Sequence, residues 1–175
     1  MRSLIASALA VILVLAALPS HANAPDPAYD QTRDWVVATI TESAGYTVDS
    51  AAVTYKDVSM DSCQLRFTTL TTTSGGYTDT ATFSISLDSL NSVLWGAANE
   101  PARGYVLFTT VTAISFSKQN VARITDRQPQ TMTTSTNVAA LEFGRPGSDG
   151  AETAKHMRAA LLRASSLCRV QLASK

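Results

Sequence analysis

Histidine is scarce in this sequence, and that scarcity excludes several kinds of catalytic chemistry. There are 2 histidines, His21 and His156, and His21 lies in a leader that we expect to be removed. One histidine makes neither a serine–histidine–aspartate triad nor a multi-histidine metal site. A P-loop, an EF-hand loop and the G-x-S-x-G and H-E-x-x-H motifs are also missing. We therefore expect no catalytic residue, no metal site and no cofactor.

Neither sign of charge predominates. Lysine and arginine together number 14, and aspartate and glutamate also number 14. A domain that binds nucleic acid would show a clear excess of basic residues. We therefore expect no nucleic-acid partner, and the overall charge implies no strongly acidic partner surface.

A long apolar run occurs only at the start of the chain. Arg2 supplies a positive charge, and residues 4–18 are almost wholly Ala, Leu, Val and Ile. Pro19 ends the run and small residues follow, as in a secretory signal peptide. A transmembrane anchor needs about 20 apolar residues, and this run is shorter. We therefore predict a signal peptide over residues 1–22.

The sequence allows two alternative cleavage sites, after Ala22 and after Ala24. The second would place Pro25 next to the cut, and proline suits a protease subsite poorly because it lacks an N–H. Cleavage after Ala22 removes Arg2 and His21 and leaves a net charge of −1. No cysteine lies near either point, so we expect no lipid or membrane anchor after cleavage. We expect a bacterial source, and we expect the mature protein to lie in the periplasm or to be secreted.

Residues 23–175 have the length of a single domain with a substantial core, which we place at about residues 28–170. The domain opens with a helix signal, because Pro27 suits the first helical position. Apolar residues then recur at steps of three and four, and Trp35 is expected to be their main packing residue. Gly45 is expected to end this helix.

After residue 51 the helical period gives way to strand patterns. The expected strands cover residues 53–56, 62–67, 80–87, 105–116 and 131–143, with a return strand at residues 121–125. Gly75 and Gly76 lie between two of them and predict a β-hairpin. Residues 88–103 differ, because Leu90, Val93 and Leu94 have a helical spacing that indicates one helical turn or a short helix.

The last element is expected to be an amphipathic helix. Asp149 supplies an N-cap and Glu152 follows three residues later, as in a capping box. An apolar stripe then recurs at steps of three and four: Ala154, Met157, Leu161, Ala164 and Cys168. The stripe must face a sheet or another helix. The expected fold class is α+β, an antiparallel half-barrel or bent sheet of about seven strands with an N-terminal helix and a C-terminal amphipathic helix.

The two cysteines are both placed on apolar faces. Cys63 lies on the apolar side of a predicted strand, and Cys168 lies on the stripe of the last helix. In an oxidising compartment we predict that they form a disulfide. The bridge would close a loop of roughly 100 residues, for which chain-entropy models give about 4–5 kcal/mol. Two buried free thiols are the alternative, because sequence does not supply the Cα separation.

Five residues form a possible binding surface. Lys155, Arg158 and Arg169 follow one flank of the last helix. Such a flank can dock an acidic partner, although charged flanks are usually the solvated side of a packed helix. Tyr77 and Tyr105 lie near predicted turns, where exposed aromatic residues mark binding edges.

The order of about seven strands followed by one helix resembles the pleckstrin-homology-like superfold. The residues that carry the resemblance are Cys63-Gln64-Leu65, residues 83–87 and residues 154–168, within a match over residues 51–170. The resemblance implies a bent barrel closed at one end by its terminal helix, in a superfold whose members mostly bind rather than transform. Fold alone does not transfer that function. An unrelated α+β sheet with helices on one face has the same element order.

Three functions remain open at this level. The first is an exported protein of the bacterial envelope that binds a partner without catalysis, such as an inhibitor or an immunity protein. The second is a carrier that holds a small ligand in a half-barrel cavity. The third is a cell-wall hydrolase that uses carboxylates such as Asp57 and Asp61, since paired acids can hydrolyse glycosides.

Overall fold

The structure is a computed structural model that describes residues 27–48, 50–76, 78–98, 103–121 and 130–173. The predicted signal peptide, both cleavage points, Tyr77 and all but the first residue of the return strand predicted at residues 121–125 lie outside these ranges. The elements in chain order are α1 (Pro27–Ser43), β1 (Gly45–Val48), β2 (Ala51–Asp61), β3 (Gln64–Thr73), β4 (Thr78–Ser86), the short 3₁₀ helix η1 (Leu87–Ser89), β5 (Leu90–Ala97), β6 (Gly104–Val121), β7 (Gln130–Gly144) and α2 (Gly150–Ala173).

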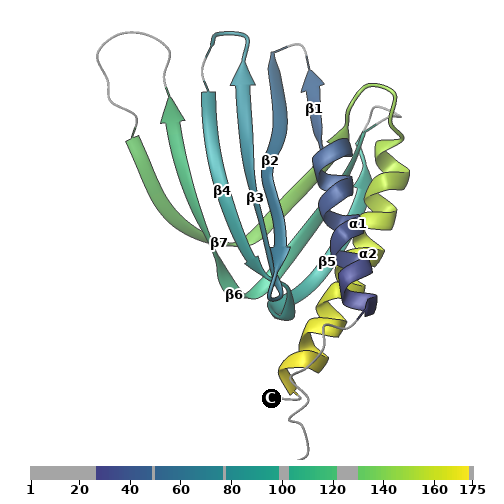
Figure 1. The fold of residues 1–175 in the computed structure, drawn as a ribbon. Helices are drawn as coiled ribbons and strands as arrows, with labels where there is room; N and C mark the ends of the chain where they lie inside the picture. Colours follow the sequence, from purple (N-terminus) through teal and green to yellow (C-terminus); the bar gives the residue numbers. More distant parts are fainter. Residues whose placement is uncertain (1–26, 49, 77, 99–102, 122–129, 174–175) are drawn as a thin grey trace, which may run out of the picture.

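The strands form one seven-stranded sheet in the order β4-β3-β2-β1-β7-β6-β5. Neighbouring strands are antiparallel except β1 and β7, which form a short parallel pairing at Gly45–Phe143 and Tyr46–Gly144. The long strand β6 pairs with β5 through its first half and with β4 through its second half, so the sheet is strongly bent (Figure 1). The predicted α+β fold with a bent sheet and two terminal helices is confirmed, and the sheet is mixed rather than wholly antiparallel.

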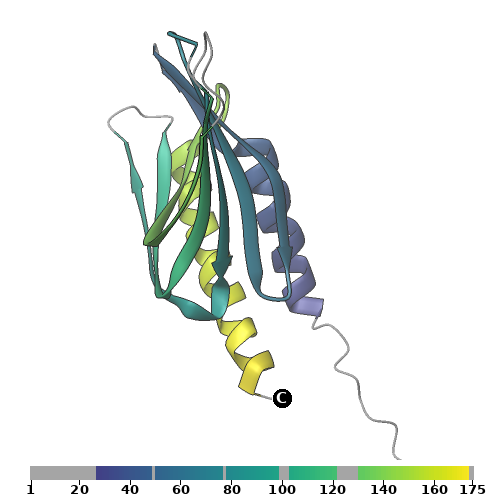
Figure 2. The same ribbon diagram turned by 90° about the vertical axis from the view of Figure 1, so that its left-hand side faces the viewer.

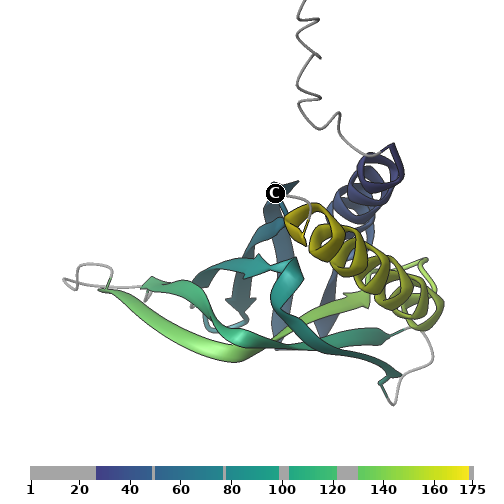
Figure 3. The ribbon, with the colours of Figure 1, turned by 90° about the horizontal axis from the view of Figure 1, so that it is seen from below.

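Both helices lie side by side on the same side of the bent sheet (Figures 1 and 3). Phe67, Phe108 and Phe143 from the strands are almost completely buried there, together with Ile40 of α1 and Leu161 of α2. The C-terminal turns of α2 extend beyond the ends of the neighbouring strands (Figure 2). The helices therefore complete a core that the sheet leaves open on one side.

The packing face of α1 differs from the prediction. Trp35 is 40% exposed, whereas Val36 and Ile40 have no exposed surface. The buried positions of α1 are Tyr29, Thr32, Val36 and Ile40, at steps of three and four. Trp35 is one residue, or about 100°, away from that stripe. The prediction was wrong because it followed side-chain size where the helical phase decides.

The helical turn or short helix predicted from Leu90, Val93 and Leu94 is also wrong. η1 ends at Ser89, and a strand, β5, follows. Its pairing with β6 shifts register between Leu90 and Ser92, and such a bulge inserts one extra residue. Leu90 and Val93 are therefore both buried although they lie three residues apart. The bulge reproduces a helical spacing inside a strand.

The predicted features of α2 are confirmed. Ala154, Met157, Leu161, Ala164 and Cys168 are at most 1% exposed. The N–H of Glu152 donates to Oδ1 of Asp149 at 3.0 Å, which satisfies one of the backbone donors left free at a helix start. The stripe and the cap together set where this helix begins and which face it buries.

Candidate functional site

A disulfide joins the β2–β3 hairpin to α2. The Cα atoms of Cys63 and Cys168 are 5.7 Å apart, and 105 residues separate them in sequence. Asp61 pairs with Gln64, so Ser62 and Cys63 form a two-residue turn, with φ angles of 47° and 63°. Two positive φ angles are typical of a type I′ turn, and they cost a non-glycine residue about 1–2 kcal/mol each. Contacts elsewhere must hold this turn.

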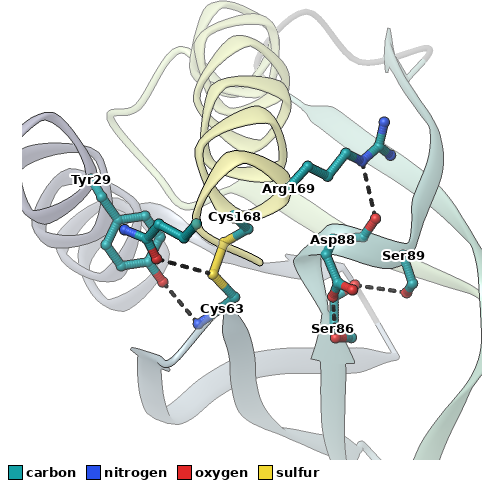
Figure 4. Close-up of a disulfide and its surroundings, with 8 residues drawn as sticks. Tyr29, Cys63, Ser86, Asp88, Ser89, Cys168 and Arg169 are labelled. Atoms are coloured by element: carbon teal, nitrogen blue, oxygen red, sulfur yellow. Dashed lines mark hydrogen bonds between the residues drawn. A yellow bond between two sulfur atoms is a disulfide. The ribbon is translucent and has the colours of Figure 1, made fainter. Parts of the chain in front are cut away.

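Cys63 is held by three elements besides its own hairpin. Its N–H donates to the hydroxyl of Tyr29 in α1 at 3.2 Å, and its carbonyl accepts from the N–H of Leu87 in η1 at 2.9 Å. Its sulfur is bonded to Cys168 of α2 (Figure 4). Burial raises the pKa of the Tyr29 hydroxyl, although its bond to Cys63 acts in the other direction. The second half of α2 is therefore fixed against the hairpin, α1 and η1.

Two arginines of α2 bind the backbone at β5, the last strand of the sheet. Nε of Arg158 donates to the carbonyl of Val93 at 2.9 Å. Nε of Arg169 donates to the carbonyl of Asp88 at 3.0 Å (Figure 4), and its Nη2 donates to the carbonyl of Leu90. Exposed carbonyls at a sheet edge invite pairing with another chain. The two arginines occupy part of that edge.

A groove of about 290 Å³ lies between β5 and α2, and we call it the β5–α2 groove. Its lining residues are Leu90, Asn91, Ser92 and Val93 from the strand and Leu162, Ser165, Ser166, Arg169 and Val170 from the helix. Leu162 is 40% exposed and Val170 is 66% exposed. Exposed apolar side chains that border a groove are typical of binding sites.

One basic side chain of α2, that of Arg169, lines the groove, and α2 as a whole is basic. α2 carries Lys155, Arg158, Arg163 and Arg169 against a single acid, Glu152. Nζ of Lys155 and Nε2 of His156 both lie 3.2 Å from Oε1 of Glu152, so the acid is engaged at the start of the helix. β5 has no charged residue. The groove is therefore a mixed surface, in which apolar side chains lie beside serines, an asparagine and the guanidinium of Arg169.

The predicted binding residues are only partly brought together. Arg169 lines the β5–α2 groove, Arg158 binds the carbonyl of Val93 beside it, and Lys155 is one turn before Arg158 on the same helix. Tyr105 is opposite Gly96 on β5, and a Cβ on that glycine would lie 2.5 Å from the tyrosine hydroxyl. The Tyr105 ring thus covers the glycine on the face of the sheet away from the core. Tyr77 lies outside the described residues.

Sequence reasoning missed the exposed side of the groove. Leu162 and Val170 belong to a second stripe of small and apolar residues on α2, at steps of three and four: Ala159, Leu162, Ser166, Val170 and Ala173. This period is as regular as that of the buried stripe. It could have been found by asking which apolar positions of the helix remain after one face is assigned to the core.

The carboxylates considered for hydrolysis are not gathered in a shared pocket. Asp57 lies at a register shift between Lys56 and Ser59, with a φ of 51°. Asp61 lines two surface pockets, one with Gln64 and Arg66 and one with Arg33 and Asp34, neither of which Asp57 lines. Both side chains belong to exposed residues. A pair of catalytic acids would flank one cleft.

A separate polar cluster joins the ends of β1, β6 and β7. Nη2 of Arg103 lies 2.9 Å from Oε2 of Glu142, and its guanidinium lies 4.2 Å from the centre of the Tyr46 ring. The N–H of Glu142 donates to the hydroxyl of Tyr55 at 3.1 Å. Burial strongly raises the pKa of the Tyr55 hydroxyl. Every charge in this cluster has a partner, so it stabilises the sheet rather than offering a site.

Within the described part of the chain, no three His, Cys, Asp or Glu residues lie close enough to hold a metal ion. No helix among those residues has the length and apolar content needed to cross a membrane. Comparisons with protein-family models, curated proteins and solved structures found no match. The β5–α2 groove must therefore be interpreted from its own geometry.

Proposed function

We propose that this protein is an exported binding protein of the bacterial envelope, without catalytic activity, which holds a partner protein in the β5–α2 groove as an inhibitor or immunity protein does. The observation that carries the proposal is the groove itself, with Leu162 and Val170 exposed beside the cationic side chain of Arg169. Apolar contact supplies affinity in protein interfaces, and complementary charge supplies speed and specificity.

The rigidity of the groove supports binding. The Cys63–Cys168 disulfide fixes the second half of α2, and Arg158 and Arg169 tie the same helix to β5 and η1. A preorganised surface loses little conformational entropy when a partner binds. A disulfide also suits an oxidising compartment, which agrees with the export predicted from residues 1–22.

The other two functions have less support. A carrier needs an internal cavity, but the inner side of the bent sheet is filled by large buried side chains such as Phe67, Phe108 and Phe143. A carboxylate hydrolase needs two acids in one cleft, and Asp57 and Asp61 do not line the same pocket. We therefore retain the binding function alone.

The test is affinity capture from an envelope extract of the source bacterium. The exported chain would be compared with its Val170→Asp variant and with Val111→Asp as a matched control. Both residues are largely exposed, and Val111 lies on β6 outside the groove. The protein and its control should retain the same partner, and Val170→Asp should retain at least about tenfold less. Equal retention by all three, or no partner above background, would contradict the proposal.

A further inference from the structure

We infer that two copies of this chain associate through the outer faces of α1 and α2, with α1 of each copy over α2 of the other. This face is separate from the β5–α2 groove, so the inference goes beyond the proposed function and does not depend on it. It follows from an exposed tryptophan beside a second groove, from the opposite charges of the two helices and from the area that they present.

A second groove, of about 290 Å³, lies between the two helices, and we call it the α1–α2 groove. Its lining residues are Gln31, Thr32 and Trp35 from α1 and Ala159, Ala160 and Arg163 from α2. None of them lines the β5–α2 groove. Trp35 is 40% exposed, and the small side chains of the two alanines face it across the groove. Tryptophan is enriched at the centres of protein interfaces, where it fills pockets of the partner.

The groove opens on the side of the helices that faces away from the sheet. Gln31, Trp35, Ala159 and Arg163 are all exposed, whereas the buried residues of both helices belong to the core. Among the described elements, no strand or helix lies over this side of α1 and α2 (Figure 3). It is therefore a free surface of the single chain.

The two helices carry opposite charges. α1 has three acids, Asp30, Asp34 and Glu42, and one base, Arg33, so its net charge is −2. α2 has four bases and one acid, so its net charge is +3 with His156 neutral. The helices run antiparallel beside each other (Figures 1 and 2). The layer that they form is therefore acidic along one helix and basic along the other.

Two of these charged groups have capacity left for a partner. Arg163 makes no hydrogen bond or ion pair within the described part of the chain. Asp34 shares Arg33 with Asp30, and its side chain is 70% exposed. An arginine can bind a carboxylate with two parallel hydrogen bonds. Arg163 can therefore bind a carboxylate of another molecule, and Asp34 can supply one.

Charge selects one orientation of the two copies. A two-fold axis perpendicular to the helices would place α1 over α1 and α2 over α2, so like charges would meet. An axis parallel to the helices, above the gap between them, places each α1 over the other copy's α2, so opposite charges meet. This second axis keeps every residue at the same height along the helices.

The same axis brings the groove residues of the two copies together. Trp35 and Arg163 line one groove and therefore lie at about the same height. Trp35 of each copy then lies over the α1–α2 groove of the other, and the carboxylate of Asp34 meets Arg163 of the other copy. Each contact occurs twice, as in any isologous dimer.

Other occupants fit this face less well. A uniformly acidic surface, such as an anionic membrane, would meet Asp34 and Glu42, and a uniformly basic surface would meet Arg163. Like charges placed opposite each other cost free energy. A matching partner must carry an acidic row and a basic row side by side, and a second copy provides that pattern by symmetry.

The helices present enough area for a reversible dimer. α1 has 17 residues and is therefore about 25 Å long, and two helices side by side are about 20 Å wide. The face thus measures about 500 Å² per copy and about 1,000 Å² for the pair, which is the lower limit for a specific interface. We therefore expect a weak dimer that dissociates on dilution.

The first test is sedimentation velocity of the exported chain with its disulfide intact, at concentrations from about 1 to about 500 μM. The sedimentation coefficient should rise with concentration from that of a monomer to that of a dimer. A monomer at every concentration would overturn the inference.

Trp35→Ala should raise the dissociation constant of the dimer at least about tenfold, because it removes the residue at the centre of the interface. Trp95→Ala is a matched control, since Trp95 is 43% exposed and lines neither groove. Its dimer should be as stable as that of the unchanged protein. Equal weakening by both variants would mean that the dimer forms through another face, and the inference would fail.

A pair of charge reversals tests the orientation. In the dimers of Asp34→Arg and of Arg163→Asp, two like-charge pairs face each other, so each dissociation constant should rise at least about tenfold. In an equimolar mixture of the two variants both pairs again have opposite charges, so the dimer should return. Its return also shows that both variants are folded. A mixture that stays monomeric, or single variants that dimerise as the unchanged protein does, would overturn the reciprocal arrangement.

Discussion

The two faces of α2 have similar residues and opposite environments. The stripe through Leu161 and Cys168 is at most 1% exposed, whereas Leu162 and Val170, on the other stripe, are 40% and 66% exposed. Both stripes repeat at steps of three and four. Periodicity shows that a helix has an apolar face, but it does not show what covers that face. The sheet covers the first face, and we propose that a partner covers the second.

The largest expected effect comes from removing the disulfide that holds the buried face of α2. The double variant Cys63→Ala, Cys168→Ala opens a loop of 105 residues, which chain-entropy models value at about 4–5 kcal/mol. We expect the free energy of unfolding in urea to fall by about that amount. Reduced wild-type protein is the control and should match the variant. A loss below about 1 kcal/mol would mean that packing alone holds α2.

The second test compares the two faces directly. Leu161→Ala should lower the free energy of unfolding by about 2–5 kcal/mol, because it leaves a cavity in the core. Leu162→Ala should change it by no more than about 0.5 kcal/mol but should weaken partner capture. Chemical unfolding of the two variants measures the difference. Similar losses of stability at both positions would remove the distinction between the faces.

A third test extends the comparison to the sheet beneath α2. Burial raises the pKa of Tyr55 above its ordinary value of 10.0, so the folded protein favours the neutral hydroxyl. Its contribution to stability is therefore full below pH 10 and is lost as the pH rises further, by about 1.4 kcal/mol per pH unit. Unfolding measured between pH 9 and 11 should show the decline. Tyr55→Phe should reduce the slope, and an unchanged slope would contradict the assignment.

The smallest effect is expected at the turn between β2 and β3, to which the disulfide joins the buried face of α2. Ser62 has a φ of 47°, and asparagine tolerates that conformation better than serine does. Ser62→Asn should raise the free energy of unfolding by about 0.5–1 kcal/mol. Thermal unfolding of the two oxidised proteins measures the difference. A lower free energy of unfolding in the variant would show that the serine makes a contact that stabilises the fold by more than its backbone strain costs.

Local patterns predicted the parts of the fold in which one element decides its own geometry. The cap at Asp149 and the stripe of α2 could be read because both are repeats within one helix. The pairing of Cys63 and Cys168 followed from two such faces and was confirmed. The error at Trp35 arose because side-chain size was weighed above helical phase, and the error at β5 arose because its register depends on the neighbouring strand β6.

The candidate site was less predictable than the fold. Arg158 and Arg169 were identified from their flank of the helix, but their carbonyl partners lie 65 and 79 residues away in the chain. Nothing local to α2 encodes that β5 lies beside it. The groove exists only because these two distant segments meet.

The sequence by itself determined the type of most elements, the apolar face of α2 and the faces that bring the two cysteines together. These properties depend on the spacing of side chains along one segment. Only the tertiary structure decided that β1 and β7 run parallel, that Trp35 stays exposed and that two arginines border a groove. Those properties depend on contacts between segments far apart in the chain. No local pattern contains the entropy cost of closing such long loops, or the packing between the segments once they meet.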